Sequence, residues 1–512
     1  MDVFKINLSE QASQRDLKNI LVFTAAISLI FSLSQVLLDP VINHDGILYI
    51  STAYHLQNGD WQTASQQYNW LFFPLIVAQL SSLTSLSLEY SAYILNALFT
   101  AITCTSFVLI IKEFGGKDRA TLWFASLIIL CFPNLNEYRN LVIRDHGYWA
   151  FYLLSCYFFI KAYQHVSVRT MAPLLISSAL ATLFRIEGLL FVLLLPALAI
   201  IHHQPLFKSK KTIAIQTLTI LLLAGLAYSF IYNQDIKGFS KTTQLERAIE
   251  KPFAKIDKSI ELTKSYLGKL APKGFSNNYA PTILGFAFIL ILLTEAVSSM
   301  SPFYVLMLMF ALFKQESFRT KPLFRPWIYL ILINSIILCS FLVSGFFLAG
   351  RYPIALALTL LIPLPFIAQI IYQKFLDKKL LPKQIKLIKL ASVLFIILSI
   401  DGLISTGASK MYVKNAGQWI ASNQSQQLSL FTNNTFVNFY ATGQNKNRIG
   451  EPNFGTVLHK IKKGELKKFD LLAIQVSRKN HDGKLALLKL ITIKPLKTFS
   501  NSRGDSVFIF KQ

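Results

Sequence analysis

Charged residues are scarce in this sequence. Asp, Glu, Lys and Arg make up 15% of the 512 residues, whereas 53% of the residues are hydrophobic. A soluble globular protein carries roughly 25% charged residues. Acidic residues are the scarcer kind, with 26 Asp and Glu against 51 Lys and Arg. This balance excludes an ordinary soluble globular protein.

Cysteines are few, and their positions exclude a disulfide framework. The four cysteines, Cys104, Cys131, Cys156 and Cys339, all fall inside apolar runs, where they are expected to behave as small buried hydrophobes. The sequence also lacks a GxGxxG or Walker motif, an internal repeat and a low-complexity segment. Histidines occur without the spacing of a metal site. No soluble nucleotide-binding motif and no metal-site spacing is therefore visible in the sequence.

Hydrophobic runs of about 20 residues recur along the chain, and this is the length that spans a hydrocarbon core of roughly 30 Å. The first run has no small-residue cleavage site, so we interpret it as a retained anchor. The runs predict a polytopic α-helical membrane protein with about 11 transmembrane helices. The predicted spans are 20–38, 91–111, 119–133, 147–163, 171–185, 188–201, 212–232, 284–312, 326–346, 353–372 and 386–404.

Basic residues cluster in alternate connections between these spans, and such clusters mark cytoplasmic loops. All of them fall on one side if the amino terminus is cytoplasmic, and eleven spans then place the carboxyl terminus outside. The positive charge is thereby explained without nucleic acid as a partner. The clustered residues are Lys112, Lys117, Arg119, Lys161, Arg169, Lys208, Lys210, Lys211, Lys314, Arg319, Lys321, Arg325, Lys374, Lys378, Lys379 and Lys383.

The polar segments predict the domain organisation. Residues 1–404 form the transmembrane domain, with a first outer loop at 39–90 and a second, lysine-rich outer loop at 233–280. Within the first loop, the apolar piece 70–80 is too short to span a membrane and is expected to form a helix at the membrane surface. Residues 405–512 alternate helical and apolar strand patterns, which predicts a small extracytoplasmic α/β domain.

The predicted α/β domain has helices at 415–423 and 484–491 and strands at 428–433, 470–476 and 505–511. It carries 17 Lys and Arg against 5 Asp and Glu. This excess of positive charge has two explanations, a solvated basic surface or contact with anionic lipid headgroups or an anionic glycan acceptor.

Five ionisable residues from four separate stretches of chain fall at the outer ends of the predicted spans: Asp45, Asp145, Arg185, Glu187 and Arg351. Ionisable groups near a bilayer are costly and mark functional sites. A carboxylate can deprotonate an acceptor hydroxyl, and a guanidinium can hold a departing phosphate. A second carboxylate can orient a sugar or bind a divalent cation. The cluster therefore indicates glycosyl transfer at the membrane surface.

Each of these residues also has a purely structural explanation. Asp45 next to Gly46 suits a turn or a helix cap, and Asp145 can pair with Arg144 or cap the following helix. Arg185 and Glu187 can form an ion pair that stabilises a broken hairpin. Arg351 can act as an interfacial anchor. His44 and His146, which neighbour the two aspartates, suit ordinary loop positions.

At these residues the chain resembles the GT-C superfamily of integral membrane glycosyltransferases, which includes protein O-mannosyltransferases and the bacterial aminoarabinose transferase. The first outer loop of this superfamily opens with a D-x-x-x-Y motif, which Asp45 to Tyr49 match. RDHGYWAFYLL around Asp145, FRIEGLLFVLLLP around Arg185 and GRYPIALALTLLIPL around Arg351 match later elements in order.

The resemblance implies roles for these residues. Asp45 would be the catalytic base and Asp145 a second catalytic carboxylate. Arg351, Arg185, Glu187, Tyr49, Arg144 and His146 would bind the substrate or its phosphate. Many members carry two adjacent acids in the first motif, whereas here His44 precedes Asp45 and Gly46 follows it. This departure weakens the case for a metal, so no metal ligand is assigned and a divalent cation stays an open question.

The resemblance also implies the substrates and the location. The donor would be a polyprenyl-phosphate-linked sugar, and the acceptor a lipid, glycan or protein of the cell envelope. The protein would lie in the bacterial inner membrane, in contact with membrane lipids, with its carboxyl-terminal domain in the periplasm. A glycan polymerase or ligase, a transporter or flippase for a lipid-linked molecule, and a non-catalytic scaffold are the alternatives. A transporter usually places its charged site near the bilayer midplane.

Overall fold

The computed structural model describes residues 10–202, 242–314, 323–403, 410–423, 429–443 and 452–512. Contacts divide the chain into two compact units. The first unit comprises residues 1–31, 96–139 and 144–403, and the second comprises residues 32–95, 140–143 and 404–512. The second unit thus joins the predicted first outer loop to the carboxyl-terminal residues. The predicted boundary at residue 404 stays a prediction.

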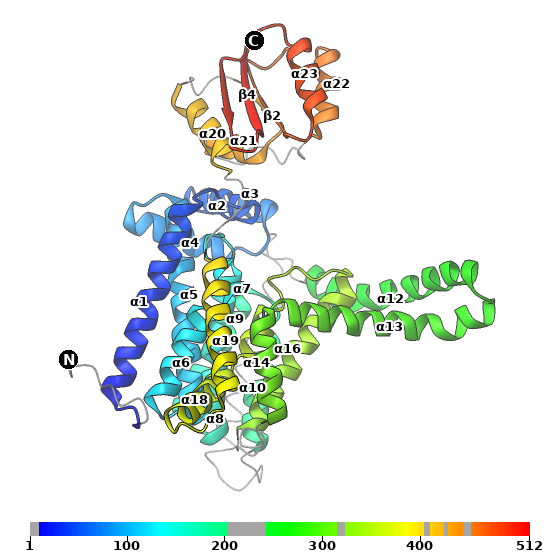
Figure 1. Cartoon of the computed structure of the whole chain (residues 1–512). Helices are drawn as coiled ribbons and strands as arrows, with labels where there is room; N and C mark the ends of the chain where they lie inside the picture. The colour runs from blue at the N-terminus through cyan, green and yellow to red at the C-terminus, as the bar shows by residue number, and fades with distance from the viewer. Residues whose placement is uncertain (1–9, 203–241, 315–322, 404–409, 424–428, 444–451) are drawn as a thin grey trace. The chain divides into compact units, whose positions relative to one another are not determined.

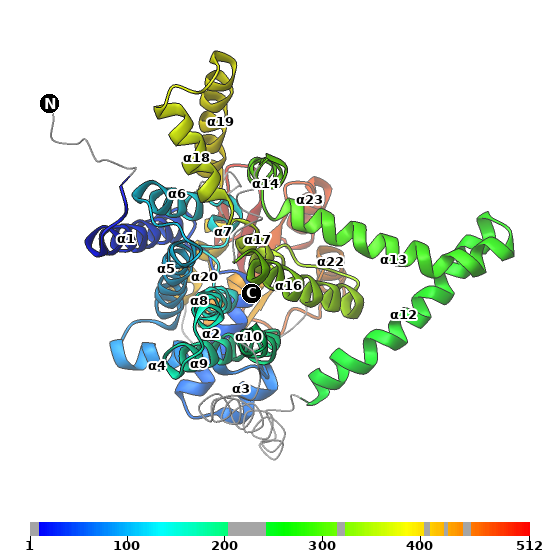
Figure 2. The same cartoon turned by 90° about the horizontal axis from the view of Figure 1, so that it is seen from below.

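The first unit is built from helices, most of which run side by side (Figures 1 and 2). Two of its helices, α1 (Gln14–Leu38) and α5 (Leu88–Glu113), continue into the second unit. The others are α6 (Arg119–Leu130), α7 (Pro133–Asn136), α8 (Asp145–Gln164), α9 (Val168–Phe184), α10 (Gly188–His202), α12 (Thr242–Leu270), α13 (Lys273–Ser298), α14 (Pro302–Lys314), α16 (Phe324–Gly345), α17 (Ile354–Leu360), α18 (Leu364–Leu376) and α19 (Pro382–Asp401).

Five stretches of described helix are long and apolar enough to cross a membrane: Gln14–Leu38, Leu88–Glu113, Gly274–Ser298, Phe324–Val343 and Ile354–Leu376. Shorter apolar helices include α6, α9 and α10. Polar pairs join the helices internally, as where the hydroxyls of Thr24 on α1 and Ser126 on α6 lie 2.7 Å apart. The chain is a mostly helical multi-pass membrane protein, although a count of eleven spans is not established.

One predicted span is interrupted, and another contains a short turn. The stretch 284–312 divides into α13 and α14, because Ser301 adopts a left-handed φ of 67° and Pro302 starts a new helix. The stretch 353–372 contains α17 and α18, which a short turn before Leu364 separates, but together they form one of the five candidate spans. The predicted span 212–232 and the first part of the second outer loop lie outside the described residues. The amphipathic helix expected in that loop is present as α12.

Two glycines allow α8, α9 and α10 to pack closely. A Cβ on Gly147 of α8 would lie 2.2 Å from the Phe184 ring, and a Cβ on Gly188 of α10 would lie 2.4 Å from the Thr182 backbone nitrogen. Contacts that short are not tolerated, so only glycine fits at either position. Both glycines lie close to the turn between α9 and α10, and they hold that turn against the start of α8.

In the second unit, helices α2 (His44–Gln57), α3 (Trp61–Gln67) and α4 (Phe72–Thr84) follow α1. The helix predicted at 70–80 is therefore present as α4. Tyr49 on α2 joins the three helices, because its ring lies 5.2 Å from that of Tyr68 and 5.3 Å from that of Phe73, both edge-on.

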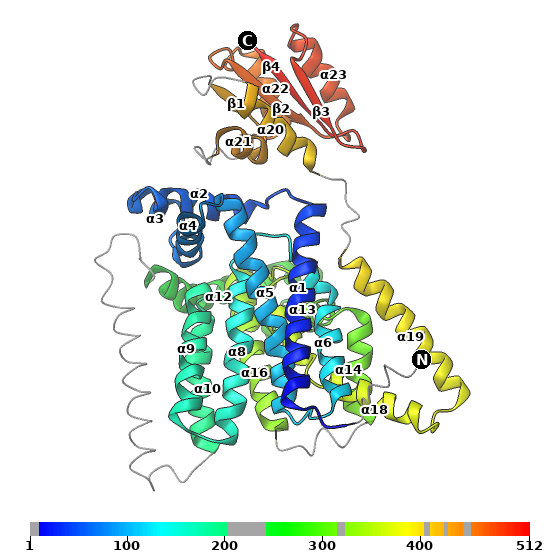
Figure 3. The ribbon, with the colours of Figure 1, turned by 90° about the vertical axis from the view of Figure 1, so that its left-hand side faces the viewer.

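The carboxyl-terminal residues form a four-stranded sheet with helices (Figure 3). The sheet order is β1-β2-β4-β3, in which β1 pairs parallel to β2 and the other pairs are antiparallel. The elements are α20 (Met411–Asn423), β1 (Leu430–Thr432), α21 (Thr435–Thr442), α22 (Phe454–Lys462), β2 (Leu471–Val476), α23 (His481–Leu490), β3 (Lys497–Ser500) and β4 (Ser506–Lys511).

The core of this sheet follows from the apolar run of β2, which is buried along nearly its whole length. Leu472 and Ile474 of β2 pack with Phe508 and Phe510 of β4 and with Leu487 of α23. The strands predicted at 428–433, 470–476 and 505–511 are present. Strand β3 was not predicted, because it is a mostly exposed edge strand whose sequence, KTFS, has no apolar run.

Candidate active site

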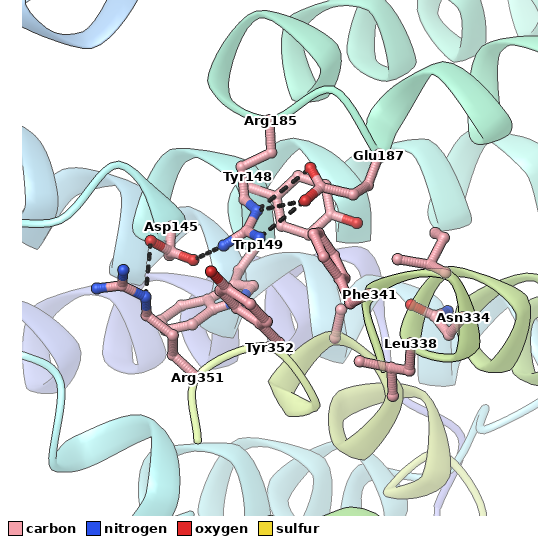
Figure 4. A pocket seen from close by; sticks show the side chains of 12 residues that line it. Asp145, Tyr148, Trp149, Arg185, Glu187, Asn334, Leu338, Phe341, Arg351 and Tyr352 are labelled. Atoms are coloured by element: carbon pink, nitrogen blue, oxygen red, sulfur yellow. Dashed lines mark hydrogen bonds and ion pairs between the residues drawn. The ribbon is translucent and has the colours of Figure 1, made fainter. Parts of the chain in front are cut away.

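The first unit contains a small cavity lined by charged and apolar side chains (Figure 4). Its free volume is about 10 Å³, close to the minimum that one water molecule needs. Four of the residues predicted from the sequence meet here. The lining residues are Asp145, Tyr148, Trp149, Arg185, Glu187, Asn334, Ile337, Leu338, Phe341, Arg351, Tyr352 and Ala355.

Arg185 lies at the centre of the charged cluster, between two carboxylates. Its Nη1 donates to Asp145 Oδ1, and its Nη2 donates to Glu187 Oε1 at 2.8 Å. Its Nε donates to both oxygens of Glu187 at 3.3 Å. The predicted Arg185–Glu187 ion pair is therefore present, and Asp145 pairs with Arg185. Burial makes these pairs interdependent, because removing one partner strands the charge of another.

Aromatic rings enclose the Arg185 guanidinium. Its Cζ lies 4.4 Å from the ring centre of Tyr352, 5.5 Å from that of Phe341 and 5.7 Å from that of Tyr148. A guanidinium within about 6 Å of an aromatic face is attracted to the ring quadrupole. With two carboxylates and three rings as neighbours, Arg185 is held in one place and acts as the centre of the site.

Arg351 approaches the cluster from the opposite side of Asp145 (Figure 4). Its Nε lies 3.7 Å from Asp145 Oδ2, and its side chain is 25% exposed, against 5% for Arg185. Asp145 thus lies between two guanidinium groups. Two acids and two arginines balance in charge, and Arg351 is the cation of this cluster that an anionic ligand can reach most easily.

The helices position these groups through their ends. Arg185 is the extended residue that ends α9, and Glu187 precedes the first residue of α10. Asp145 is the first residue of α8, where a carboxylate is favoured by the helix dipole. Arg351 and Tyr352 precede α17. The charged cluster therefore forms where three chain turns converge.

A buried hydrogen-bond network supports the apolar side of the cavity. Asn334 Nδ2 on α16 donates to the Tyr152 hydroxyl at 2.7 Å, and that hydroxyl lies 2.5 Å from Thr359 Oγ1. The Trp327 indole N–H donates to the Thr359 carbonyl at 2.8 Å. These bonds tie α16 to α8 and α17, and the lining residues Ile337, Leu338 and Phe341 follow Asn334 along α16.

Asp45 and Tyr49 belong to the second unit. Asp45 lies half-buried in the first turn of α2, whose N-cap is Asn43. The Asn43 side chain does not cap the helix, because its Oδ1 accepts the Val142 backbone N–H at 2.8 Å. A Cβ on Gly46 would lie 2.6 Å from Ile42 Cγ1. Glycine is therefore required next to Asp45 for a reason of packing.

His146 and Arg144 do not line the cavity, although both flank Asp145. The His146 ring is buried, with Nδ1 3.0 Å from Thr100 Oγ1 and Nε2 2.9 Å from the Tyr138 carbonyl oxygen. These contacts fit a histidine that joins α5 to α8. Arg144 is half-buried immediately before α8.

Among the residues that the structure describes, no three His, Cys, Asp or Glu side chains lie close enough together to bind a metal ion. In the charged cluster, both oxygens of Asp145 face guanidinium nitrogens. A cation would have to displace an arginine to reach this carboxylate.

Several lining residues were missed by the sequence interpretation. Asn334 is a polar residue inside an apolar span, and this signal was available. Tyr352 follows Arg351 directly and was read only as part of the GRYP motif. Tyr148, Trp149 and Phe341 carried no signal, because aromatic residues are common throughout this chain.

No family model matches the sequence. No curated protein matches it either. Solved structures do match. The chain superimposes on the crystal structure of the Archaeoglobus fulgidus oligosaccharyltransferase, in complex with zinc and sulfate, with a TM-score of 0.54 and 12% identity. This match covers 92% of this chain and 69% of the archaeal one.

A second match is apo ArnT from Cupriavidus metallidurans, with 12% identity over 96% of this chain and 98% of that one. Its TM-score is 0.43, so it adds no support to the fold assignment. The oligosaccharyltransferase match extends over nearly all of this multi-pass chain. On that similarity, the chain shares the fold of this archaeal oligosaccharyltransferase.

Proposed function

We propose that this protein transfers a sugar from a polyprenyl-phosphate-linked donor to an acceptor of the cell envelope. The observation that carries the proposal is the Asp145–Arg185–Glu187–Arg351 cluster in a chain that shares the fold of an oligosaccharyltransferase. Such a cluster suits a substrate with a charged phosphate and a long apolar tail, because charged and apolar residues line the same cavity.

In the proposed reaction, the Asp45 carboxylate takes the proton of the acceptor hydroxyl as its oxygen attacks the anomeric carbon of the sugar. The bond between that carbon and the phosphate oxygen breaks, and the polyprenyl phosphate leaves. Arg351 receives the negative charge that develops on the phosphate, since a guanidinium offers a planar fork of donors.

Asp145 has a different part in this proposal from the one that the resemblance implies. Both of its oxygens face arginines, so it is a poor proton acceptor and instead orients the two guanidinium groups. Glu187 holds the other side of Arg185. Tyr49, Arg144 and His146 then act by supporting the elements that carry the site.

The proposal includes a location. The protein lies in a bacterial inner membrane with about eleven spans and a cytoplasmic amino terminus. Both outer loops and the carboxyl-terminal α/β region then face the periplasm, where an envelope acceptor is available.

The test compares lipid-linked sugars and envelope glycans by mass spectrometry in a strain that lacks the protein and in the same strain complemented with it. We expect the deletion to remove one sugar from an envelope component while its polyprenyl-linked donor accumulates on the periplasmic side. Accumulation on the cytoplasmic side alone would favour a flippase. No change in either pool would contradict the proposal.

Arg351 provides a second prediction. Arg351→Gln is expected to lower the transfer rate about 10- to 100-fold, because hydrogen bonds to charged groups contribute about 1.5–3 kcal/mol and each 1.4 kcal/mol is tenfold. Since Arg351 is partly exposed, the thermal unfolding temperature should change little. Arg169→Gln serves as the control, because it removes an exposed arginine in the first turn of α9, and Arg169 does not line the cavity. Equal rates for both variants would rule out a role for Arg351.

A further inference from the structure

The residues immediately before α2 are bound by side chains from the carboxyl-terminal helices. Lys414 of α20 donates from Nζ to the Pro40 carbonyl oxygen at 2.7 Å. The Ile42 backbone N–H donates to the Tyr440 hydroxyl of α21 at 3.0 Å. All of these residues belong to the second unit, and Asp45 follows Ile42 by three positions.

Glu89, at the start of α5, joins the two side chains. The Tyr440 hydroxyl donates to Glu89 Oε1 at 3.2 Å, and Lys414 Nζ lies 3.4 Å from the same oxygen. Lys414 Nζ also lies 4.8 Å from the Tyr440 ring centre. We call Glu89, Lys414 and Tyr440 the clamp. Glu89 on α5 is thereby joined to two carboxyl-terminal helices, α20 and α21, more than 300 positions further along the chain.

The clamp is partly shielded from solvent, which strengthens its bonds. Side-chain exposure is 13% for Lys414 and 21% for Glu89. Burial raises the pKa of Tyr440 well above its usual value, and the negative charge of Glu89 raises it further. The hydroxyl therefore stays protonated, so it can donate to Glu89 while it accepts from Ile42.

A ring contact extends the clamp to the first residue of α2. The His44 ring lies 4.5 Å from the Phe436 ring of α21. With Asn43 bound to Val142, every residue from Ile42 to His44 is then held by a contact from another part of the second unit. These residues directly precede Asp45 and set the start of the helix that carries it.

We propose that Tyr440 and Lys414 are positioning residues that fix the first turn of α2 and thereby orient Asp45 for proton transfer. This inference rests on the proposed function, in which Asp45 is the base. The carboxyl-terminal region is then needed for transfer itself, through its two helices α20 and α21, beyond any contact that it makes with an acceptor. Displacing the Asp45 carboxylate would slow the reaction, since a displacement of about 1 Å can lower a rate about 100-fold.

The experiment uses full-length protein in membranes and four variants. Tyr440→Phe removes the bridging hydroxyl, Lys414→Met removes the charge, and Lys414→Arg keeps it. The control is Tyr412→Phe, which removes a tyrosine hydroxyl of α20 that accepts from Gln475 Nε2 at 2.6 Å without contact to the clamp. The transfer rate comes from mass spectrometry of the glycan product, and hydrogen exchange is followed in peptides covering residues 41–50.

We expect Tyr440→Phe and Lys414→Met each to lower transfer about 10- to 100-fold and to speed exchange at the first turn of α2. The unfolding temperature and exchange elsewhere should stay unchanged. Lys414→Arg should retain most of the activity, and Tyr412→Phe all of it. These differences separate positioning from general stability.

Two outcomes overturn the inference. One is unchanged transfer in Tyr440→Phe and Lys414→Met while Asp45→Asn is inactive, which leaves the proposed function intact. The other is an equal loss of transfer activity in Tyr412→Phe together with a lower unfolding temperature, which would mean that the clamp contributes only to the stability of the fold. If Asp45→Asn itself keeps full activity, the proposed function fails first.

Discussion

Asp45→Asn is expected to lower the rate of sugar transfer by a factor of about 10² to 10⁴, the usual contribution of a general base. Asparagine has nearly the same shape as aspartate but cannot accept the hydroxyl proton. Because Asp45 is half-buried in the first turn of α2, the substitution should leave the helix in place. The measurement is the initial rate of glycan modification after induction of each variant at equal expression.

Asp60→Asn is the matched control for this prediction. Asp60 is also an aspartate of the second unit, and its Oδ1 accepts the Thr63 backbone N–H at 3.0 Å as the N-cap of α3. Asparagine caps helices about as well as aspartate, so activity should be unchanged. An Asp45→Asn variant as active as Asp60→Asn would remove Asp45 from the mechanism.

Arg185→Met is expected to have the largest effect on stability, a loss of about 3–5 kcal/mol. The substitution leaves Asp145 and Glu187 as two buried carboxylates from which the shared cation has been removed. Methionine fills much of the same volume and packs well against aromatic rings. The loss of stability would therefore arise from the missing charge. Thermal unfolding in detergent micelles measures it, and transfer activity should disappear as well.

A compensating variant distinguishes charge from packing. Arg185→Met combined with Asp145→Asn and Glu187→Gln removes the stranded charges, and we expect it to recover most of the stability. Activity should not return, since the orientation of Arg351 by Asp145 is lost. Should the single variant unfold at the wild-type temperature, Arg185 would not be the centre of the cluster.

Local patterns were sufficient for most helices and strands. The apolar run at 91–111 is present as α5, and the run at 470–476 is present as β2. The RDHGYWAFYLL motif around Asp145 marks the start of α8. Local patterns missed an exposed strand, β3, and they treated 284–312 as one span although Pro302 marks the break after Ser301. Hydrophobic periodicity reports burial, so it detects neither case well.

The partners of the charged residues were less predictable. The sequence analysis expected Asp145 to pair with Arg144 or to cap its helix. In the structure Asp145 pairs with Arg185, 40 positions along the chain, and faces Arg351. Which residues meet depends on how helices pack, and Gly147 and Gly188 set that packing through backbone contacts that no charge pattern reports.

By itself, the sequence determined that this is a multi-pass helical membrane protein, because only long apolar runs can cross a bilayer. It also indicated which ionisable residues are candidates for the site, because charged groups near a bilayer are costly. Only the tertiary structure decided that Arg185 also binds Asp145 and that Tyr440 and Lys414 bind the residues before α2. These contacts join residues 40 to nearly 400 positions apart. Their formation depends on the packing of whole helices, which local sequence does not encode.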